Sequence, residues 1–281
     1  MIRILADSTC DLSEELLKKY NIEIIPLHIV LDDKEYLDGR EIHSDEIYKW
    51  SEENNQTPKT SAVSIKDVLD VMQPIISNGD EIIAFCISEK LSTTANVFRL
   101  AAQELEAEDK VSVINSESLS TGIGLLVIEA AIMAQEGKNK SEIVETIENL
   151  IPNVRASFVV DTLVFLHRGG RCSSVAAIAG SMLKLHPMIV LNNGGMIATK
   201  KYRGKMNSVI LEYVKDMTED LKQAKKDRVF ITHSGCDQEI IDSVHNYLKD
   251  LNVFDEILIT RAGGVISSHC GPGTLGVLYI K

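Results

Sequence analysis

The feature that most constrains the fold of this 281-residue chain is an alternation of short β-branched runs with longer amphipathic segments. The β-branched runs predict strands, and the apolar residues that recur with helical spacing predict helices. Alternating strands and helices are typical of βα units around a mostly parallel sheet, so we predict an α/β protein. In the first half, predicted strands lie at residues 2–6, 23–29, 82–87 and 111–114, and predicted helices at 13–20, 44–53, 64–77, 93–106 and 121–135.

The alternation breaks at Pro152-Asn153, after a predicted helix at 141–150. A second region starts with a strand at 157–160. Asn192-Asn193-Gly194-Gly195 then predicts a tight hairpin between strands at 186–191 and 196–202, because an Asn-Gly pair tolerates positive φ. A strand, a helix and a strand follow at 228–232, 238–251 and 256–260. We therefore predict two domains, residues 1–153 with a mostly parallel sheet and residues 154–281 as a second α/β domain with some antiparallel strands.

Charge is distributed unevenly along the chain. There are 29 Lys and Arg residues against 41 Asp and Glu, and the net charge of −12 argues against generic binding of nucleic acid. Residues 151–210 nevertheless carry eight basic side chains and one acidic side chain, so this window has a charge of +7 and the remainder −19. The asymmetry indicates a docking face for a negative partner or a phosphate, with ordinary solvated side chains as the alternative.

The sequence contains neither a secretory nor a membrane signal. Asp7 interrupts the first apolar run too early for a signal-peptide core, and no later run approaches the length of a membrane-spanning helix. We expect a cytoplasmic protein without stable membrane insertion. The five cysteines are odd in number, widely spaced and without a CxxC motif, which predicts buried free thiols rather than disulfides or structural zinc.

One stretch, Gly271-Pro272-Gly273-Thr274-Leu275-Gly276, matches the G-x-G-x-x-G fingerprint of dinucleotide-binding proteins. That motif works by leading a strand into a helix, and the residues from Val277 to Lys281 are too few to form one. We therefore reject a dinucleotide site. The sequence also lacks the phosphate-binding G-x-x-x-x-G-K-[ST] loop, the G-x-S-x-G nucleophile elbow and the H-E-x-x-H zinc motif.

Hydroxyl groups gather in loops at the ends of the predicted parallel strands, which meet at one edge of a sheet. Such neutral donors suit one small anionic or carbonyl group, although helix capping alone explains any single one of them. The apolar stretch 175–183, with 188–191 after it, predicts either the wall of a tunnel or ordinary core. The hydroxyl-bearing loops are Asp7-Ser8-Thr9, Thr60-Ser61, Ser88, Ser92-Thr93-Thr94 and Asn115-Ser116.

Six short motifs occur in the order seen in DegV-type bacterial proteins, and the chain resembles that family over its whole length. Each motif is weak alone, and the six together in register are specific. They are Asp7-Ser8-Thr9-Cys10-Asp11-Leu12, Thr60-Ser61, Leu91-Ser92-x-Thr94, Leu166-x-x-Gly169-Gly170-Arg171, Lys201-x-Arg203-Gly204 and Gly264-Val265-Ile266-x-x-His269-x-Gly271-Pro272-Gly273-x-x-Gly276.

The resemblance implies a fatty-acid-binding protein in which two α/β domains enclose one long-chain fatty acid. It further implies that a separate, dihydroxyacetone-kinase-like fatty acid kinase phosphorylates the presented carboxyl group, so that this chain needs no cofactor and performs no ATP chemistry itself. Carried over residue by residue, the carboxylate-binding group consists of Thr60, Ser61, Ser92 and His269, and the residues facing the kinase are Arg171 and Arg203. Such a site relies on hydroxyls and one imidazole rather than on an arginine clamp.

Two other functions stay open from the residues alone. The chain could be an acyl transferase or hydrolase that uses Ser92 and His269, with Asp7 or Asp161 as the orienting acid. It could also be a fatty-acid-responsive regulator that binds other proteins through the basic window.

Overall fold

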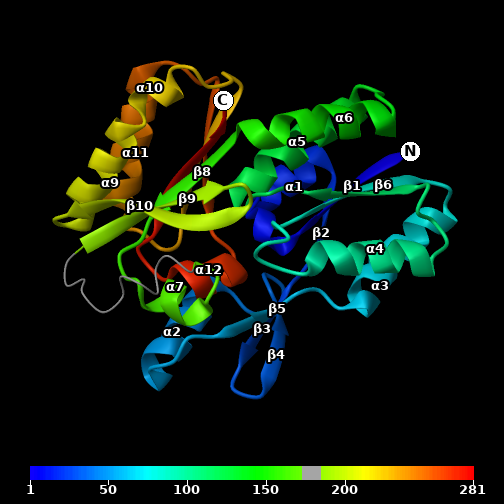
Figure 1. Cartoon of the computed structure of the whole chain (residues 1–281), viewed down its shortest axis with the longest axis horizontal. Coiled ribbons are helices and arrows are strands. Elements are labelled where there is room, and N and C mark those ends of the chain that lie inside the picture. Colours follow the sequence, from blue (N-terminus) through cyan, green and yellow to red (C-terminus); the bar gives the residue numbers. More distant parts are fainter. Residues whose placement is uncertain (173–184) are drawn as a thin grey trace.

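Three β-sheets organise the chain, and the computed structural model describes residues 1–172 and 185–281 of it (Figure 1). The first sheet has four parallel strands, which confirms the mostly parallel sheet predicted for the first half. In spatial order its strands are β2 (Ile22–Ile25), β1 (Ile2–Asp7), β6 (Glu81–Cys86) and β7 (Val111–Asn115).

Helices cover both faces of the parallel sheet because successive strand residues point to opposite sides. Ile4 packs with α1 (Glu14–Tyr20), α5 (Thr121–Gln135) and α6 (Lys140–Leu150), whereas Leu5 packs with α3 (Ile65–Ser77) and α4 (Thr94–Glu104). α3 begins at a capping box, in which the hydroxyl of Ser64 accepts a hydrogen bond from the amide of Asp67 at 3.2 Å. The predicted helices of this half are therefore confirmed.

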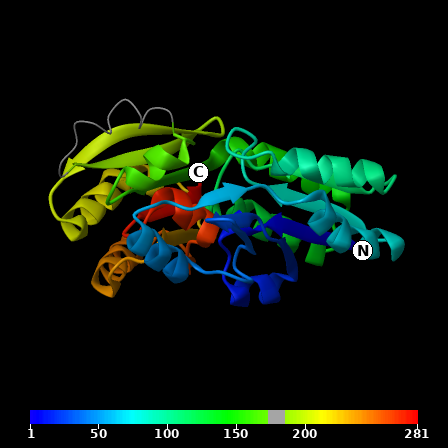
Figure 2. The same ribbon diagram turned by 90° about the horizontal axis from the view of Figure 1, so that it is seen from below.

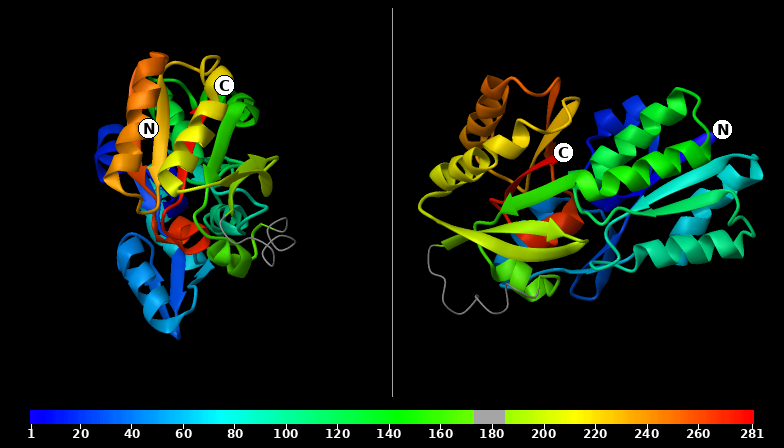
Figure 3. Two further views of the ribbon diagram at one scale, coloured as in Figure 1. Left: turned by 90° about the vertical axis from the view of Figure 1, so that its left-hand side faces the viewer. Right: turned by 45° about the horizontal axis from the view of Figure 1, so that its top comes forward.

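The single strand predicted at residues 23–29 is wrong. Pro26 lacks an amide donor and separates two strands that join different sheets. β2 ends before it, and β3 (His28–Leu31) pairs with β4 (Lys34–Leu37) and β5 (Lys59–Ser61) in a small antiparallel sheet. This sheet and α2 (Ser44–Asn54) project from one side of the molecule (Figure 3).

The second half of the chain builds a six-stranded mixed sheet. The predicted hairpin is present, with Asn193 and Gly194 at φ 46° and 77°, and only β11 and β12 run parallel to each other. One face of the sheet is covered by α9 (Met206–Asp216), α10 (Thr218–Leu221) and α11 (Gln238–Leu251). In spatial order the strands are β10 (Gly195–Arg203), β9 (Leu185–Asn192), β8 (Val154–Val159), β13 (Leu275–Ile280), β11 (Arg228–His233) and β12 (Glu256–Arg261).

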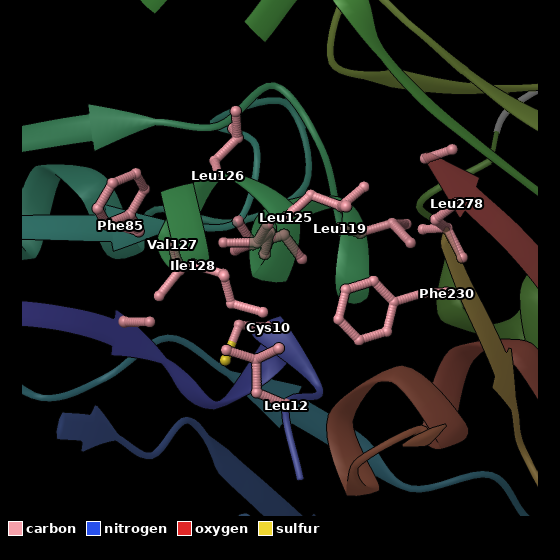
Figure 4. Packing of buried hydrophobic residues seen from close by; sticks show 14 of the residues in the cluster. Cys10, Leu12, Phe85, Leu119, Leu125, Leu126, Val127, Ile128, Phe230 and Leu278 are labelled. Atoms are coloured by element: carbon pink, nitrogen blue, oxygen red, sulfur yellow. The ribbon is translucent and has the colours of Figure 1, made fainter. Parts of the chain in front are cut away.

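Helix α5 lies between the parallel sheet and the six-stranded sheet, and its apolar residues pack in both directions (Figure 4). Leu125, Leu126 and Ile128 are at most 1% exposed, in one cluster with Phe85 of β6 and Phe230 of β11. A helix that is apolar on all sides is expected in such a buried position. The strands of the parallel sheet all precede residue 153 and those of the six-stranded sheet all follow it. The division into two domains stays a prediction.

Two short helices, α7 (Val164–Gly169) and α12 (Gly264–Cys270), lie side by side near the centre of the molecule (Figures 1 and 2). α12 follows β12 in the chain but packs against α2, β3 and β5, which all belong to the N-terminal part of the sequence. The G-x-G-x-x-G stretch follows α12, turns through Gly271 and Gly273 at φ 75°, and enters β13. The order is helix, turn, strand, the reverse of the order in a dinucleotide-binding motif.

The remaining expectations concern thiols, membranes and the tunnel wall. None of the five cysteines, all of which lie in the described residues, forms a disulfide, and four of them are buried. Among residues 1–172 and 185–281, none of the helices has the length and hydropathy needed to cross a bilayer. The apolar stretch 175–183 lies outside the described residues. Residues 188–191 are part of β9, where Ile189 is fully buried in the core and the other three residues are half-buried, so both alternatives stay predictions for this segment.

Candidate functional site

One cavity of about 300 Å³, called the main cavity below, collects most of the residues singled out from the sequence. Its walls come from β5, the loop after β6, α12, the hairpin strand β10 and the turn after α7, so both halves of the chain contribute. The apolar lining consists of Leu27, Ala62, Ile87, Leu91, Leu119, Met196, Val265, Ile266 and Cys270, and the polar lining of Thr60, Ser61, Glu89, Lys90, Ser92, Thr93, Arg171 and His269.

Thr60 and His269 meet in the main cavity although 209 positions separate them in the sequence. The Thr60 Oγ1 atom is 2.8 Å from Nε2 of His269, within hydrogen-bond distance. β5 supplies the threonine and α12 supplies the histidine. The pair is thus fixed by two rigid elements and presents one hydroxyl and one imidazole to the same space.

His269 is neutral near physiological pH. Burial, and to a smaller degree the Arg171 guanidinium, lower the pKa of His269 to about 4. Its Nδ1 atom is shielded from solvent and has no hydrogen-bond partner among residues 1–172 and 185–281. Gly169 lies against this atom so closely that an added Cβ would be 2.3 Å from Nδ1. The imidazole therefore lies between Thr60 and Gly169, and a larger residue at position 169 would displace it.

The two serines of the predicted group differ. Ser92 is partly buried, and its hydroxyl bonds Thr94 Oγ1 at 2.9 Å and accepts from the Thr94 amide at 3.3 Å. Ser61 is exposed, and its hydroxyl is directed to the Glu35 carboxylate at 3.3 Å. Ser92 can keep these bonds and still donate to a ligand, whereas the Ser61 hydroxyl already has an acceptor.

Cations line the cavity as well, which the sequence-based expectation of a site without an arginine missed. Arg171 is exposed at the cavity and donates to the Gly169 carbonyl oxygen at 2.8 Å. Lys90 also lines the cavity. Neither side chain has a carboxylate partner among the described residues. Arg171 could be found from the sequence, because it lies in the basic window at residues 151–210. Nothing in the sequence distinguishes Lys90 before the β9–β10 hairpin packs against it.

Arg203 does not share this cavity. Cys172, next to Arg171, donates to the carbonyl oxygen of Met196 at 3.5 Å, which places Arg171 near the start of β10. Arg203 is the last residue of that strand, and at about 3.3 Å per residue it lies roughly 20 Å further on. The two arginines therefore occupy different places, one at the cavity and one at the far end of the hairpin.

Several hydroxyl-bearing loops that we expected in one crevice lie elsewhere. The Asp7 carboxylate accepts a hydrogen bond from the Thr9 amide at 3.0 Å, and the Ser8 hydroxyl donates to Asp38 at 2.8 Å. Ser88 donates to the Gly194 carbonyl oxygen at 2.7 Å. Ser116 caps its own turn. The ends of the strands do lie near one another, but some of their hydroxyl groups line the cavity and others form hydrogen bonds within the surrounding turns.

A second, smaller cavity of about 20 Å³ continues from the first. Leu119, Ile266 and Cys270 line both of them. Beyond this shared wall the small cavity is bounded by Phe158 and Leu278 of the six-stranded sheet and by the polar residues Ser120, Thr232, His233, Ser234 and Thr274. The apolar character of the site therefore comes from the nine apolar residues that line the main cavity itself.

A larger hollow than the main cavity lies elsewhere and differs in charge. It measures about 440 Å³ and is lined by Asp11, Glu14, Asp38 and Asp45 together with basic side chains. Carboxylates on the wall disfavour an anionic ligand. The main cavity has neutral donors and unpaired cations, and its lining carboxylate Glu89 is paired with Arg99 at 2.6 Å, so it is the better candidate for a ligand with one acidic group.

The arrangement required for serine catalysis is not assembled. The Ser92 hydroxyl bonds its own neighbour, and Nε2 of His269 bonds Thr60. Asp7 accepts from main-chain amides behind the cavity, and Asp161 lies beside a different histidine. In the described part of the chain, no group of three or more His, Cys, Asp or Glu side chains is placed to hold a metal ion. The geometry supports binding better than nucleophilic chemistry.

Fold and cavity together define an α/β protein whose main cavity is lined by both apolar side chains and polar donors. The chain belongs to the DegV family: residues 1–281 match the family described as "Uncharacterised protein, DegV family". A DegV domain-containing protein of Caldanaerobacter subterraneus is 31% identical over 280 residues, which cover 99% of this chain and 98% of the relative.

Solved structures of the family share the whole fold. A DegV family protein from Thermus thermophilus, described as binding fatty acid, has a TM-score of 0.91 at 30% identity and covers 100% of this chain and 99% of its own. The DegV protein of Bacillus subtilis, described as a fatty acid binding protein, has a TM-score of 0.86 at 26% identity with the same coverage. The resemblance stated from the six motifs is thereby confirmed at the level of family and fold.

Proposed function

We propose that this protein binds a long-chain fatty acid in the main cavity and presents the carboxylate to a separate fatty acid kinase. The single observation that carries the proposal is the cavity itself. It combines the Thr60–His269 pair with a wall of nine apolar residues. The relatives from Thermus thermophilus and Bacillus subtilis, described as binding fatty acids, support the same ligand class.

An acyl chain supplies most of the binding free energy in such a cavity. Each buried methylene contributes about 0.8 kcal/mol, so a long chain contributes on the order of 10 kcal/mol before the costs of association. The polar lining then needs only to orient the carboxylate. Neutral donors from Thr60 and Ser92 suit this task, because they bind the carboxylate without burying a counter-charge against it. The single N–H of a neutral His269, donated to Thr60 from Nε2, would leave the threonine hydroxyl free to donate to the carboxylate.

The carboxylate would lie at the open end of the cavity, where a partner can reach it. Ser61, Lys90 and Arg171 are exposed there. We assign Thr60, Ser92 and His269 to the carboxylate, Ser61 to the rim through its main chain, and Arg171 to the rim, where it can contact both the ligand and the partner. The fatty acid would then lie between the proposed domains 1–153 and 154–281.

Kinase docking rests on the unpaired cations of the basic window. Lys200 is compensated by Asp216 at 2.5 Å, whereas no carboxylate within the described residues pairs with Lys201, Arg203 or Arg168. Lys201 and Arg203 lie on the same exposed face of β10, because alternate strand residues share a face. This face fits an acidic surface of the kinase.

Mass spectrometry of an organic extract of the purified protein tests the ligand. We expect a long-chain monocarboxylic acid in stoichiometric amount. A nucleotide, a sugar phosphate or an empty protein in repeated preparations would contradict the proposal.

Presentation is tested separately with the protein, ATP and a fatty acid kinase from a bacterium that encodes a DegV protein. Acyl phosphate should form only when all three are present. Turnover of acyl esters by the protein alone would instead support the acyl transferase or hydrolase alternative.

A further inference from the structure

Three carboxylates, Asp7, Asp11 and Asp38, are buried behind the main cavity, with 0%, 5% and 3% of their surfaces exposed. None of them lines that cavity. Each instead accepts a hydrogen bond from a main-chain amide of a segment that does. We call these three residues the carboxylate cluster.

Asp7 holds the wall that follows β6. Its Oδ2 atom accepts from the amide of Ile87 at 2.8 Å, and its Oδ1 atom accepts from the amide of Thr9 at 3.0 Å. Ile87 lines the cavity and begins the loop that carries Ser92. One buried side chain thus joins the end of β1 to this loop.

Asp38 acts together with Ser8 on two other walls. The Ser8 hydroxyl donates to Asp38 Oδ2 at 2.8 Å and accepts from the amide of Leu27 at 3.1 Å. Asp38 Oδ1 accepts from the amide of Gly264, the first residue of α12, at 2.7 Å. Leu27 lines the cavity, and α12 carries His269.

Asp11 completes the attachment of α12. Its Oδ1 atom accepts from the amide of Gly263 at 2.8 Å, and its other oxygen accepts from the Ser120 hydroxyl at 2.5 Å. Gly264 lies so close to its neighbours that a side chain would not fit: an added Cβ would be 2.5 Å from Ile29 and 2.8 Å from Asp38. The start of α12 is therefore seated directly on carboxylates from the N-terminal part of the chain.

We propose that Asp7, Asp11 and Asp38 are positioning residues for the ligand site, and that they set how long the fatty acid stays bound. The observation is a shared pattern: the segments tied to the cluster each contribute to the wall of the cavity, through Leu27, Ile87, α12 and Leu119, the residue before Ser120. A ligand enclosed between elements of both halves leaves when these walls separate. The residence time is the part of this proposal that rests on the proposed function.

The chemistry of a carboxylate suits this role. A carboxyl group has two oxygens, so each side chain can join two segments: both oxygens accept when it is ionised, and a protonated group still accepts through one oxygen and can donate through the other. Removing one leaves buried amides unpaired, which favours opening of the walls. Asp38 tolerates asparagine in principle, because an amide can accept from Gly264 and donate to Ser8. Asp7 does not, because both of its oxygens face donors.

The test measures release of radiolabelled oleate into excess unlabelled oleate, using the full chain and the variants Asp38→Ala, Asp38→Asn and Asp7→Asn. Hydrogen–deuterium exchange of the ligand-free proteins at the amides of Leu27, Ile87 and Gly264 is measured in parallel. Asp80→Ala is the matched control, because Asp80 is also 5% exposed but bonds the N-terminal amine at 2.6 Å, before β6.

We expect Asp38→Ala and Asp7→Asn to release oleate about ten-fold faster or more and to exchange faster at these amides. Asp38→Asn should restore most of the wild-type rate, and Asp80→Ala should lower the Tm without changing release. If Asp7→Asn and Asp38→Ala lose stability but keep wild-type release and exchange, the cluster is merely structural and the proposal is overturned. If Asp38→Ala does not fold, Asp7→Asn decides.

Failure of the two proposals can be told apart. If the wild-type protein binds no oleate or other fatty acid, the proposed function fails, while the exchange measurement still reports whether the cluster holds the walls.

Discussion

The two ends of α12 meet the rest of the protein through opposite chemistry. At its start, the amides of Gly263 and Gly264 bond buried carboxylates, which makes this end rigid. At its other end, a neutral His269 pairs with Thr60 in a cavity that reaches the surface. Carboxyl groups thus bond the protein's own amides at the start of the helix, and neutral donors are left at its other end, where a ligand with its own negative charge would bind. Glu89, a carboxylate that lines the cavity, pairs with Arg99 at 2.6 Å, which reduces its repulsion of such a ligand.

The largest effect on fatty acid affinity is expected from changes at the end of α12 that carries His269. His269→Ala and Thr60→Ala should each weaken fatty acid binding about 10- to 100-fold, because a hydrogen bond to a charged group contributes about 1.5–3 kcal/mol. Isothermal titration calorimetry with delipidated protein measures the Kd. Ser61→Ala is the matched control and should change the Kd by less than about three-fold, since its hydroxyl bonds Glu35.

Equal affinities for the His269→Ala and wild-type proteins would mean that the carboxylate lies elsewhere. A strong loss in Ser61→Ala would show that this hydroxyl turns from Glu35 to the ligand.

A methyl group at Gly169 should disturb the same end without removing any donor. In Gly169→Ala the new Cβ would overlap Nδ1 of His269, so the imidazole must move away from Thr60. We expect the Kd to rise about ten-fold, comparable to the loss of one hydrogen bond. Gly195→Ala is the control, because its Cβ would meet nothing closer than 3.7 Å. If both variants bind alike, His269 is not held by this contact.

The sequence predicts the elements better than it predicts the contacts between them. The helices at 121–135 and 238–251 have the predicted bounds, because helical periodicity is local information. The single strand predicted at 23–29 is wrong because the change of sheet at Pro26 depends on which strands lie nearby. Asp38 does not stand out in the sequence at all. Its role arises only when the end of β4 contacts α12, which comes from a distant part of the chain, and local sequence patterns do not predict such a contact.

The site was partly predictable for a similar reason. Thr60, Ser92 and His269 stand in family motifs, and the fold brings them to one cavity. Arg171 and Arg203 also stand in such motifs, but motif membership does not say which of them lies at the cavity. That depends on how the β9–β10 hairpin packs.

The two ends of α12 should also respond to pH in opposite directions. Burial raises the pKa of Asp11 to about 8 from 3.8, so the folded protein holds a proton that the unfolded chain releases, and stability should fall as pH rises from about 4 to 8. The pKa of His269 is lowered to about 4 from 6.5, so its contribution is lost as pH falls from about 6.5 to 4.

Between pH 6.5 and 8 the Asp11 effect therefore acts without His269, and Asp7, with a pKa raised to about 6, has mostly ionised. Denaturant unfolding across this range should show declining stability in the wild-type protein and a flatter profile in Asp11→Asn. A profile that declines equally in both would remove Asp11 as the cause.

The smallest effect is expected from a residue remote from both ends of α12. Arg203→Glu reverses a charge at the far end of β10, roughly 20 Å from the cavity, so fatty acid release and the Kd should not change. Association with the kinase should slow several-fold and lose part of its dependence on salt, because long-range attraction between charged surfaces is screened by ions. Surface plasmon resonance at two salt concentrations measures this. Arg171→Glu should alter both activities, because Arg171 lines the cavity. If Arg203→Glu weakens fatty acid binding as strongly as Arg171→Glu does, the hairpin transmits changes to the cavity and the two arginines belong to one site after all.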